Sequence, residues 1–354
     1  MSKFLTEKLS GLVPYTPGEQ PRERKYIKLN TNESPYPPSE KAIEYASLEA
    51  KRLMLYSDPD CKELRRELSN TLGVEENNVI LTNGSDEVLN FAFMAYCDEK
   101  RGAAFPDITY GFYKVFAAVN SVPYKEIPLK EDFKIDVNDY IGTGEVVFIA
   151  NPNAPTGIAL PLSEIERIVS SNPDRIVVID EAYVDFGAES AVSLISKYEN
   201  LLVTGTFSKS RSMAGARLGF GVGCKEIIED LTRIRYSTNP YNVNRMTAAA
   251  GVGALKDKEY FSENCKKIIK TREKCKKELK KLGFYFTDSK TNFIFAKHNR
   301  IGGKELYLAL KERGILVRHF DSQRISDFLR ITVGSEEEMQ TLLYNIKQIT
   351  ESAK

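Results

Sequence analysis

The chain has 354 residues, of which 42% are hydrophobic, and this length predicts one large domain with a smaller one beside it. Its 50 basic and 49 acidic side chains leave a net charge of +1, which gives no support to a nucleic-acid-binding or membrane-binding surface. With two histidines and no tryptophan, the composition excludes a His-rich metal site, and an aromatic stacking platform has to be Tyr or Phe.

The first 38 residues are rich in proline, glycine and polar side chains, and they predict an extended N-terminal arm, residues 1–38, with little helix of its own. Ser39 begins a predicted helix that runs to about Leu55. We expect Asp60 to cap the next helix, because Glu63 follows three residues later, and Gly73 to end it.

Short apolar runs alternate with helical patterns in the following part of the chain. Unbroken apolar runs are typical of strands buried on both faces, and the helical patterns between them imply parallel crossovers. One such helix carries a predicted capping box of Ser163 and Glu166. The sequence therefore predicts an α/β fold, with a large domain at residues 39–256 around a mostly parallel, mixed sheet. The runs are residues 79–82, 145–150, 175–179 and 200–206.

The composition shifts after about Lys256. A long charged helix is predicted from Tyr260 to Leu282, and Gly283 ends it. Short strand-like runs with helices between and after them follow, so residues 257–354 predict a smaller α+β domain. These runs are residues 284–286, 292–295, 315–317 and 329–332.

Polar residues follow four consecutive apolar runs of the large domain. Ligands of open α/β sheets bind at the carboxyl ends of the strands, so four such ends together favour one ligand site at this edge. The polar segments are Asn83–Glu87, Asn151–Gly157, Asp180–Tyr183 and Gly205–Lys209.

Three of these segments carry candidate chemistry. Gly84-Ser85-Asp86 feeds a helix N-terminus that suits a phosphate, although Ser85 as a plain helix cap accounts for the same residues. Asp180 follows a buried strand and needs a partner, either a protonated pyridine nitrogen or a nearby arginine. Lys209 is either a partly desolvated nucleophile for an aldehyde or a solvated surface lysine.

Three arginines beside predicted strands are candidates for bidentate binding of a carboxylate or a phosphate. Arg217 precedes the apolar run of residues 218–221, and Arg318 and Arg330 lie in or beside strands of the small domain. A structural ion pair accounts for each of them equally well.

The five cysteines show no C-x-x-C spacing, and their odd number argues against a disulfide framework. The N-terminus has no apolar run of signal-peptide length, and no stretch approaches the ~18 apolar residues of a membrane span. We therefore expect a cytoplasmic protein.

The chain resembles the fold-type-I pyridoxal-phosphate-dependent aminotransferases, and within them the histidinol-phosphate aminotransferases, over nearly its whole length. The resemblance implies a homodimer and a transamination between glutamate or 2-oxoglutarate and a phosphorylated amino alcohol or its keto partner. The stretches that carry it are Pro14–Gly18, Leu29–Pro35, Tyr56–Pro59, Asn83–Glu87, Asp180–Tyr183, Thr206–Lys209, Arg217–Gly219 and Pro240–Asn244.

The resemblance also implies roles for single residues. Lys209 forms the Schiff base with the cofactor and then acts as general base, Asp180 pairs with the pyridinium nitrogen, and Tyr183 binds the ring 3-oxygen. Tyr110 stacks on the ring, and Tyr56 reaches the cofactor phosphate of the neighbouring subunit. The expected phosphate site comprises Gly84, Ser85, Asp86, Thr206, Ser208 and Arg217. The expected substrate-binding residues are Tyr15, Asn32, Arg318 and Arg330.

The stretch before Pro155 departs from the family pattern, because Ala154 stands where an asparagine is usual. The hydrogen bond that this asparagine usually makes to the ring 3-oxygen is therefore expected only if Asn153 supplies it. A decarboxylase resembling threonine-phosphate decarboxylase, or an aminotransferase for aromatic or other phosphorylated substrates, would use the same residues. A nucleotide-binding oxidoreductase is disfavoured because no G-x-G-x-x-G occurs, and a catalytically silent protein because neither Lys209 nor Asp180 is missing.

Overall fold

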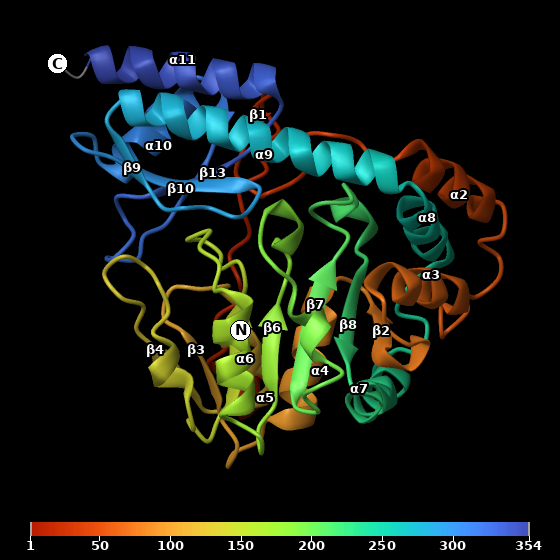
Figure 1. Cartoon of the computed structure of the whole chain (residues 1–354). Helices are drawn as coiled ribbons and strands as arrows, with labels where there is room; N and C mark the ends of the chain where they lie inside the picture. The colour runs from red at the N-terminus through yellow and green to blue at the C-terminus, as the bar shows by residue number, and fades with distance from the viewer. Residues whose placement is uncertain (1, 353–354) are drawn as a thin grey trace.

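The computed structural model describes residues 2–352 and has a large sheet at its centre with a smaller sheet above one edge (Figure 1). The large sheet has seven strands in the order β2-β8-β7-β6-β5-β3-β4. All of its strands run in one direction except β8, which is antiparallel to β2 and to β7. The strands are β2 (Val79–Thr82), β3 (Ala103–Pro106), β4 (Tyr124–Ile127), β5 (Val146–Ala150), β6 (Val177–Asp180), β7 (Leu201–Thr206) and β8 (Gly219–Gly223).

The central strands are buried on both faces, which explains their unbroken apolar sequences. On one face, Phe148 of β5 packs with residues of α4 (Ser85–Tyr96), α5 (Phe112–Asn120) and α7 (Lys225–Thr238). On the other face, Val147 and Ile149 pack against α6 (Leu162–Ser170). Because side chains alternate along a strand, one apolar run supplies both cores.

The exception, β8, decides the shape of the site. The prediction of a mostly parallel, mixed sheet did not say which strand is antiparallel. It is β8, because residues 207–218 between β7 and β8 contain the short turn Ala214–Ala216 and no crossover helix. As a result, Arg217 at the start of β8 lies at the same edge of the sheet as the ends of the parallel strands.

The small sheet has the order β12-β13-β10-β9 and lies above the carboxyl edge of the large sheet (Figure 1). Its neighbour α9 runs along the top of the molecule from α2 (Glu40–Ala50) to the C-terminal part (Figure 1). A core of buried aromatic and aliphatic residues, including Phe293 and Leu279, joins the strands to the helices. The elements are β9 (Phe284–Phe286), β10 (Phe293–His298), β11 (Ile315–Leu316), β12 (Arg318–His319), β13 (Leu329–Thr332), α9 (Lys258–Lys281), α10 (Gly303–Glu312) and α11 (Glu336–Ser352).

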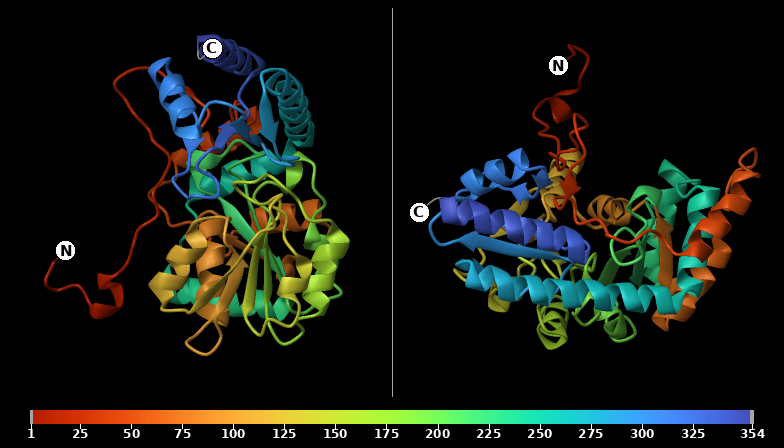
Figure 2. Two further views of the ribbon diagram at one scale, coloured as in Figure 1. Left: turned by 90° about the vertical axis from the view of Figure 1, so that its left-hand side faces the viewer. Right: turned by 90° about the horizontal axis from the view of Figure 1, so that it is seen from above.

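The N-terminal segment has two parts. The part with the short helix α1 (Glu7–Ser10) stands out from the body, as Figure 2 shows, whereas residues 15–20 lie against it. Further along, β1 (Ile27–Lys28) pairs in parallel with β11, so this part of the predicted arm adds a strand to the small domain. The domain boundaries at residues 38/39 and 256/257 stay a prediction.

One predicted helix is shorter in the structure. The helix α2 (Glu40–Ala50) begins after Ser39 as predicted, but it ends at Ala50, before Leu55. Near this end Arg245 donates to the carboxylate of Glu49 and to the backbone carbonyl of Tyr56. After Ala50 the chain forms turns. The last helix of this region, α8 (Arg245–Lys256), packs closely against α2.

Two predicted caps were wrong. The carboxylate of Asp58, not that of Asp60, accepts the backbone N–H of Lys62 in the first turn of α3 (Lys62–Leu72), at 3.0 Å. Asp60 instead binds Arg235 from α7. Ser163 is inside α6, because the backbone carbonyl of Pro161 already accepts the first bonds of that helix.

Within residues 2–352, none of the helices combines the length and the apolar character needed to cross a lipid bilayer.

Candidate active site

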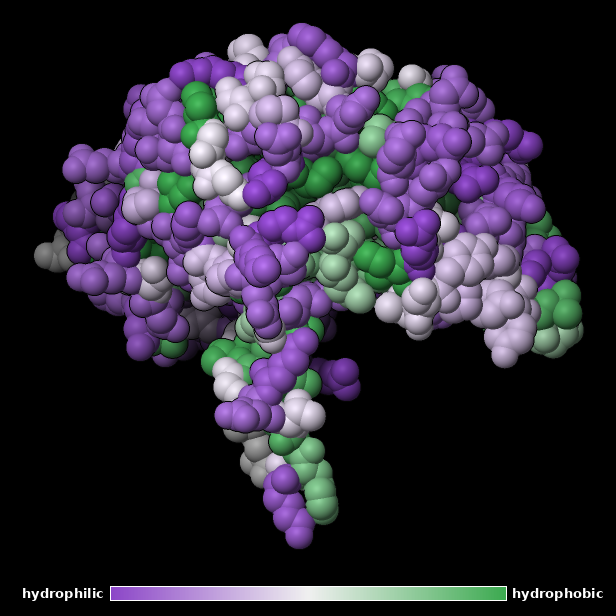
Figure 3. All heavy atoms as spheres, turned by 90° about the horizontal axis from the view of Figure 1, so that it is seen from below, coloured by the Kyte–Doolittle hydropathy of each residue, from purple (hydrophilic) through white to green (hydrophobic). Residues whose placement is uncertain are grey.

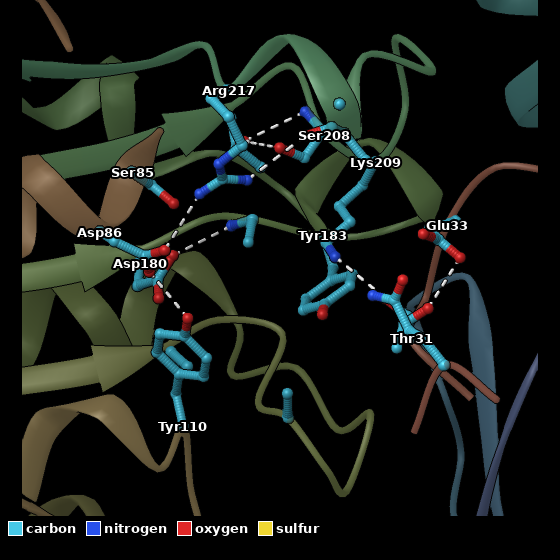
Figure 4. Close-up of a pocket in the computed structure, with 17 residues that line it drawn as sticks. Thr31, Glu33, Ser85, Asp86, Tyr110, Asp180, Tyr183, Ser208, Lys209 and Arg217 are labelled. Carbon is cyan, nitrogen blue, oxygen red and sulfur yellow. Dashed lines mark hydrogen bonds and ion pairs between the residues drawn. The ribbon is translucent and has the colours of Figure 1, made fainter. Parts of the chain in front are cut away.

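A cavity of about 380 Å³ lies at the carboxyl edge of the large sheet. Its walls come from the ends of β5, β6 and β7, from the start of α4, from the loop before β8 and from the N-terminal segment. Figure 4 shows these side chains converging on one space from separate elements. Nine residues predicted from the sequence line it: Ser85, Asp86, Tyr110, Asp180, Tyr183, Thr206, Ser208, Lys209 and Arg217.

Asp180 is the last residue of β6, and its side chain is buried. Tyr113 donates to one carboxylate oxygen at 3.2 Å, while Thr204 and the backbone N–H of Ala182 donate to the other. Burial raises the pKa of Asp180 to about 6, and the charge of Asp86 adds to the rise. Among the described residues no cation pairs with Asp180, so a positively charged ligand atom in the cavity would stabilise it.

Lys209 lies in the loop after β7 and is half-buried. Its Nζ is 3.4 Å from the backbone carbonyl of Thr31 and 5.7 Å from the centre of the Tyr183 ring. The amine therefore points into the cavity and away from bulk solvent (Figure 4). A primary amine in this position is a nucleophile for an aldehyde.

The turn at the N-terminus of α4 is shaped by two glycines. Gly84 has a φ of +78°, and a Cβ atom there would lie 2.7 Å from Nη2 of Arg217. A Cβ atom on Gly219 of β8 would lie 2.2 Å from the backbone nitrogen of Ser85. Neither position accepts a side chain without movement of its surroundings. The turn therefore keeps the N–H groups of the helix end open toward the cavity, where they favour an anion.

Hydroxyl and guanidinium groups surround this helix end. The hydroxyl of Thr206 donates to that of Ser208 at 2.9 Å, and Nη2 of Arg217 is 3.2 Å from the Asp86 carboxylate. Tyr110 donates to the other oxygen of Asp86 at 2.7 Å. We call Ser85, Thr206, Ser208 and Arg217 with the α4 turn the anion cradle, since these donors suit a phosphate.

Asn153 does not line the cavity. Its side-chain nitrogen donates to the carbonyl of Ile108 and to the hydroxyl of Thr156, and its oxygen accepts from Thr109. These bonds hold two loops together. Ala154, the next residue, lines the cavity in its place.

Tyr15 and Asn32, two residues expected to bind substrate, are not among the residues that line the cavity. Tyr15 stacks on Phe112, with ring centres 4.4 Å apart. The side chain of Asn32 is buried and donates to the Tyr183 hydroxyl at 2.9 Å. Its oxygen accepts from Thr332 of β13.

Arg330, on β13, is a half-buried cation and is not among the residues that line the cavity. Its Nη2 donates to the carbonyl of Asn30, and its Nε has no partner among the described residues. Burial lowers the pKa of Arg330, and the nearby Tyr183 and Tyr15 partly offset this. The guanidinium carbon lies 5.4 Å from the centre of the Phe293 ring. Because no carboxylate pairs with it in the described part of the chain, this guanidinium is available to an anion.

Arg318 and Tyr56 lie away from the cavity. The guanidinium of Arg318 donates to the carbonyls of Thr16 and Pro17, so it anchors the N-terminal arm. Tyr56 is 79% exposed and stacks on Tyr241, with ring centres 4.6 Å apart. Neither side chain reaches the cavity of its own chain.

Sequence reasoning missed some residues of the site. Tyr113 comes three residues after Tyr110, and Thr204 comes two residues before Thr206 on β7. Each spacing could have indicated that the second residue of the pair lies on the same face as the predicted one. The N-terminal residues come to the cavity through packing, which no local spacing indicates. The missed residues are Gln20, Thr31, Glu33, Tyr113 and Thr204.

Curated relatives are similar to this chain over nearly their whole length. A histidinol-phosphate aminotransferase from Brachyspira hyodysenteriae is 49% identical, with 99% of each chain covered. Another from Marinomonas sp. is 51% identical and covers 99% of this chain and 100% of its own.

Solved structures share the fold at lower identity. Histidinol-phosphate aminotransferase from Sinorhizobium meliloti, in complex with pyridoxal-5′-phosphate, has a TM-score of 0.92 at 21% identity and covers 100% of this chain and 99% of its own. The enzyme from Clostridium acetobutylicum has a TM-score of 0.85 at 24% identity, with 92% and 99% covered. The predicted fold-type-I architecture is thereby confirmed.

The sequence model of the family "Aminotransferase class I and II" matches residues 24–346 of this chain. These residues include every residue that lines the cavity except Gln20. The chain therefore belongs to the aminotransferase class I and II family, a family of pyridoxal-phosphate-dependent transaminases.

Proposed function

We propose that this chain transfers the amino group between histidinol phosphate and 2-oxoglutarate, with pyridoxal 5′-phosphate as cofactor, in histidine biosynthesis. One observation carries the proposal: Lys209, Asp180 and the anion cradle line a single cavity. Relatives 49% and 51% identical over 99% of the chain support the choice of substrate. The free thiols of all five cysteines support a cytoplasmic location.

The cavity fits the proposed cofactor at three points. Lys209 offers an amine for the aldehyde, Asp180 offers a buried carboxylate for the ring nitrogen, and the cradle offers donors for the phosphate. When bound, pyridoxal phosphate withdraws electrons from the substrate α-carbon. A cation beside Asp180 would also remove the cost of its burial.

The side chains of the protein then have separate tasks. Asp180 holds a proton at the ring nitrogen, because its carboxylate is buried and otherwise lacks a cation. Lys209 moves a proton at the substrate α-carbon. Tyr110 and Tyr183 form aromatic walls that exclude water. Arg330 binds the carboxylate of glutamate in one half-reaction and the phosphate of the other substrate in the next.

The substrate is tested with the cofactor-loaded enzyme in single half-reactions. We expect histidinol phosphate and glutamate each to change the visible absorption band, and histidinol without its phosphate to do so far more slowly. Added 2-oxoglutarate should then yield glutamate. Release of carbon dioxide would indicate a decarboxylase, a response to glutamate alone would contradict the proposed substrate, and failure to take up pyridoxal phosphate would contradict the cofactor.

The role of Arg330 has its own test. Arg330→Met should raise KM for both histidinol phosphate and glutamate, since both are anions. Arg300→Met, at an exposed arginine of the same domain, is the matched control and should leave both values unchanged. Equal effects of the two substitutions would contradict a direct role for Arg330.

A homodimer with shared active sites is part of the proposal. Leu53, Met54, Leu55 and Tyr56 are more than half exposed, and together they form an apolar surface that a second copy would cover. The N-terminal arm stands out from the body with hydrophobic side chains among the hydrophilic ones, as Figure 3 shows, and Phe4 is 83% exposed. We propose that Tyr56 completes the cradle of the partner.

Subunit mixing tests this arrangement. Lys209→Ala and Tyr56→Phe dimers should each have reduced activity. Dimers that carry one chain of each kind contain one intact site only if Tyr56 acts in the partner subunit, so mixing after dissociation should restore activity. If activity stays at the average of the two parents, Tyr56 has no role across the interface.

A further inference from the structure

All four polar groups of Asn32 take part in buried hydrogen bonds. Its backbone N–H donates to the hydroxyl of Thr332 at 3.0 Å, and that hydroxyl donates to its side-chain oxygen at 3.1 Å. Asn292 donates to its backbone carbonyl at 3.0 Å, and its own NH2 group donates to the Tyr183 hydroxyl at 2.9 Å. Asn32 has a φ of +57°, a conformation that asparagine accepts more readily than most residues. It is therefore held in one orientation.

This network decides where the Tyr183 proton points. The Thr332 hydroxyl accepts the Asn32 N–H and has one proton of its own, which it gives to the Asn32 side-chain oxygen. The amide NH2 therefore faces Tyr183. An NH2 group has no lone pair to offer, so the Tyr183 hydroxyl accepts from it and its own proton is directed elsewhere. The side chain lines the cavity, which is where that proton has room for an acceptor.

The direction of this proton matters more here because the neighbouring donor is missing. Ala154 lines the cavity without a polar group, and the amide of Asn153 is bonded to Ile108 and Thr156. We propose, on the basis of the function proposed above, that Asn32 is a positioning residue. It holds the Tyr183 hydroxyl as a donor to the cofactor 3-oxygen and does not itself bind substrate.

The inference also connects the two domains. Thr332 and Asn292 belong to the small domain, whereas Tyr183 follows β6 of the large sheet. A change in how the small domain lies on the large one would alter the bonds of Asn32 and, through them, the donor at the 3-oxygen.

Asn32→Asp tests the proposal in the cofactor-loaded enzyme. Aspartate has nearly the same shape and also tolerates a positive φ, but its carboxylate accepts from both Thr332 and Tyr183. The Tyr183 proton would then turn away from the cavity. We expect the pH at which the visible absorption band changes to rise by about one unit, because the negative 3-oxygen loses a donor.

Two further variants distinguish an effect through the Tyr183 hydroxyl from a direct effect of the new charge. In a Tyr183→Phe background, Asn32→Asp should add no further shift, since its effect passes through the hydroxyl. An equal shift in that background would show that the charge acts directly and would overturn the proposal. Thr332→Val removes the group that orients the amide without adding charge, so it should raise the same pH value by a smaller amount even if Asn32→Asp fails to fold.

The result also separates this inference from the function on which it rests. Uptake of pyridoxal phosphate with a band that titrates as in the unsubstituted chain, in both Asn32→Asp and Thr332→Val, would overturn only the role of Asn32. Failure of the unsubstituted chain to take up the cofactor would contradict the proposed function itself.

Discussion

Replacing Asp180 by asparagine separates the cost of burying this carboxylate from its use in binding a cofactor. The pKa of Asp180 rises from an ordinary value of 3.8 to about 6 in the folded chain, chiefly through burial. Because the folded state holds the proton more tightly than the unfolded state, this group contributes most to stability below about pH 4. That contribution is lost as the pH rises to about 6.

The magnitude follows from the two pKa values. A difference of about two units corresponds to about 3 kcal/mol at any pH above the folded value. Asparagine carries no charge, so cofactor-free Asp180→Asn should be more stable than the unsubstituted cofactor-free chain at pH 7.5 by up to about 3 kcal/mol. Below about pH 4 the advantage should disappear. With pyridoxal phosphate bound the order should reverse, because the ring nitrogen no longer has its carboxylate.

The assay is urea unfolding of both chains, followed by circular dichroism at several pH values, without and with pyridoxal phosphate. Glu181→Gln is a matched control, since burial raises the pKa of Glu181 to about 8 and its carboxylate binds Ser190 outside the cavity. Its stabilising effect should grow from about pH 4.5 and level off only above about pH 8, whereas that of Asp180→Asn levels off near pH 6, and it should leave cofactor affinity unchanged. An effect of Asp180→Asn that does not depend on pH would refute the reasoning.

Three other substitutions should have separable effects. Gly84→Ala forces a side chain into a φ of +78° and toward Arg217, so we expect a loss of about 1–2 kcal/mol and weaker cofactor binding, measured by urea unfolding and cofactor titration. Gly253→Ala places a Cβ atom 2.4 Å from the main chain of α2, and it should cost about 1–3 kcal/mol in unfolding without changing cofactor affinity. Arg324→Ala removes the ion pair of the small domain with Asp107, and we expect a loss of about 1 kcal/mol with faster proteolysis of the loop at residues 128–136.

Local pattern determined the elements of the sheet and the location of the chemistry. The strand at residues 79–82 was predicted with the bounds that the structure has, and a helix was predicted to begin at Gly84-Ser85-Asp86, where α4 begins. Burial on both faces and a glycine turn leave plain local signals. The polar ends of the parallel strands predicted a shared site for the same reason, since parallel strands end at one edge. Lys209, Asp180 and the hydroxyl groups of the cradle were found in this way. Arg217 was found separately, as an arginine that precedes an apolar run.

Caps within a few residues of a helix were harder to predict, although they are local. Asp58 and Asp60 are both suitable caps for α3. Asp58 caps the helix, because Asp60 forms an ion pair with Arg235 of a helix distant in sequence. Sequence spacing does not include that competition. A mixed sheet was predicted, but not which of its strands is antiparallel, because that depends on how residues 207–218 fold and pack on the sheet.

The partners of single side chains were decided by the tertiary structure alone. The spacing of residues along the chain identified Arg318 and Arg330 as polar groups near strands, and the family resemblance assigned both of them, with Asn32, to the substrate. Packing of the small domain on the large one brings Asn32 to Tyr183 and turns Arg318 toward the arm. It leaves Arg330 half-buried without a carboxylate partner among residues 2–352, so of the three only Arg330 keeps its proposed substrate role. A hydrogen bond between residues 32 and 183 spans 151 positions, and the energy that selects it comes from the burial of both domains together, which no local stretch of sequence contains.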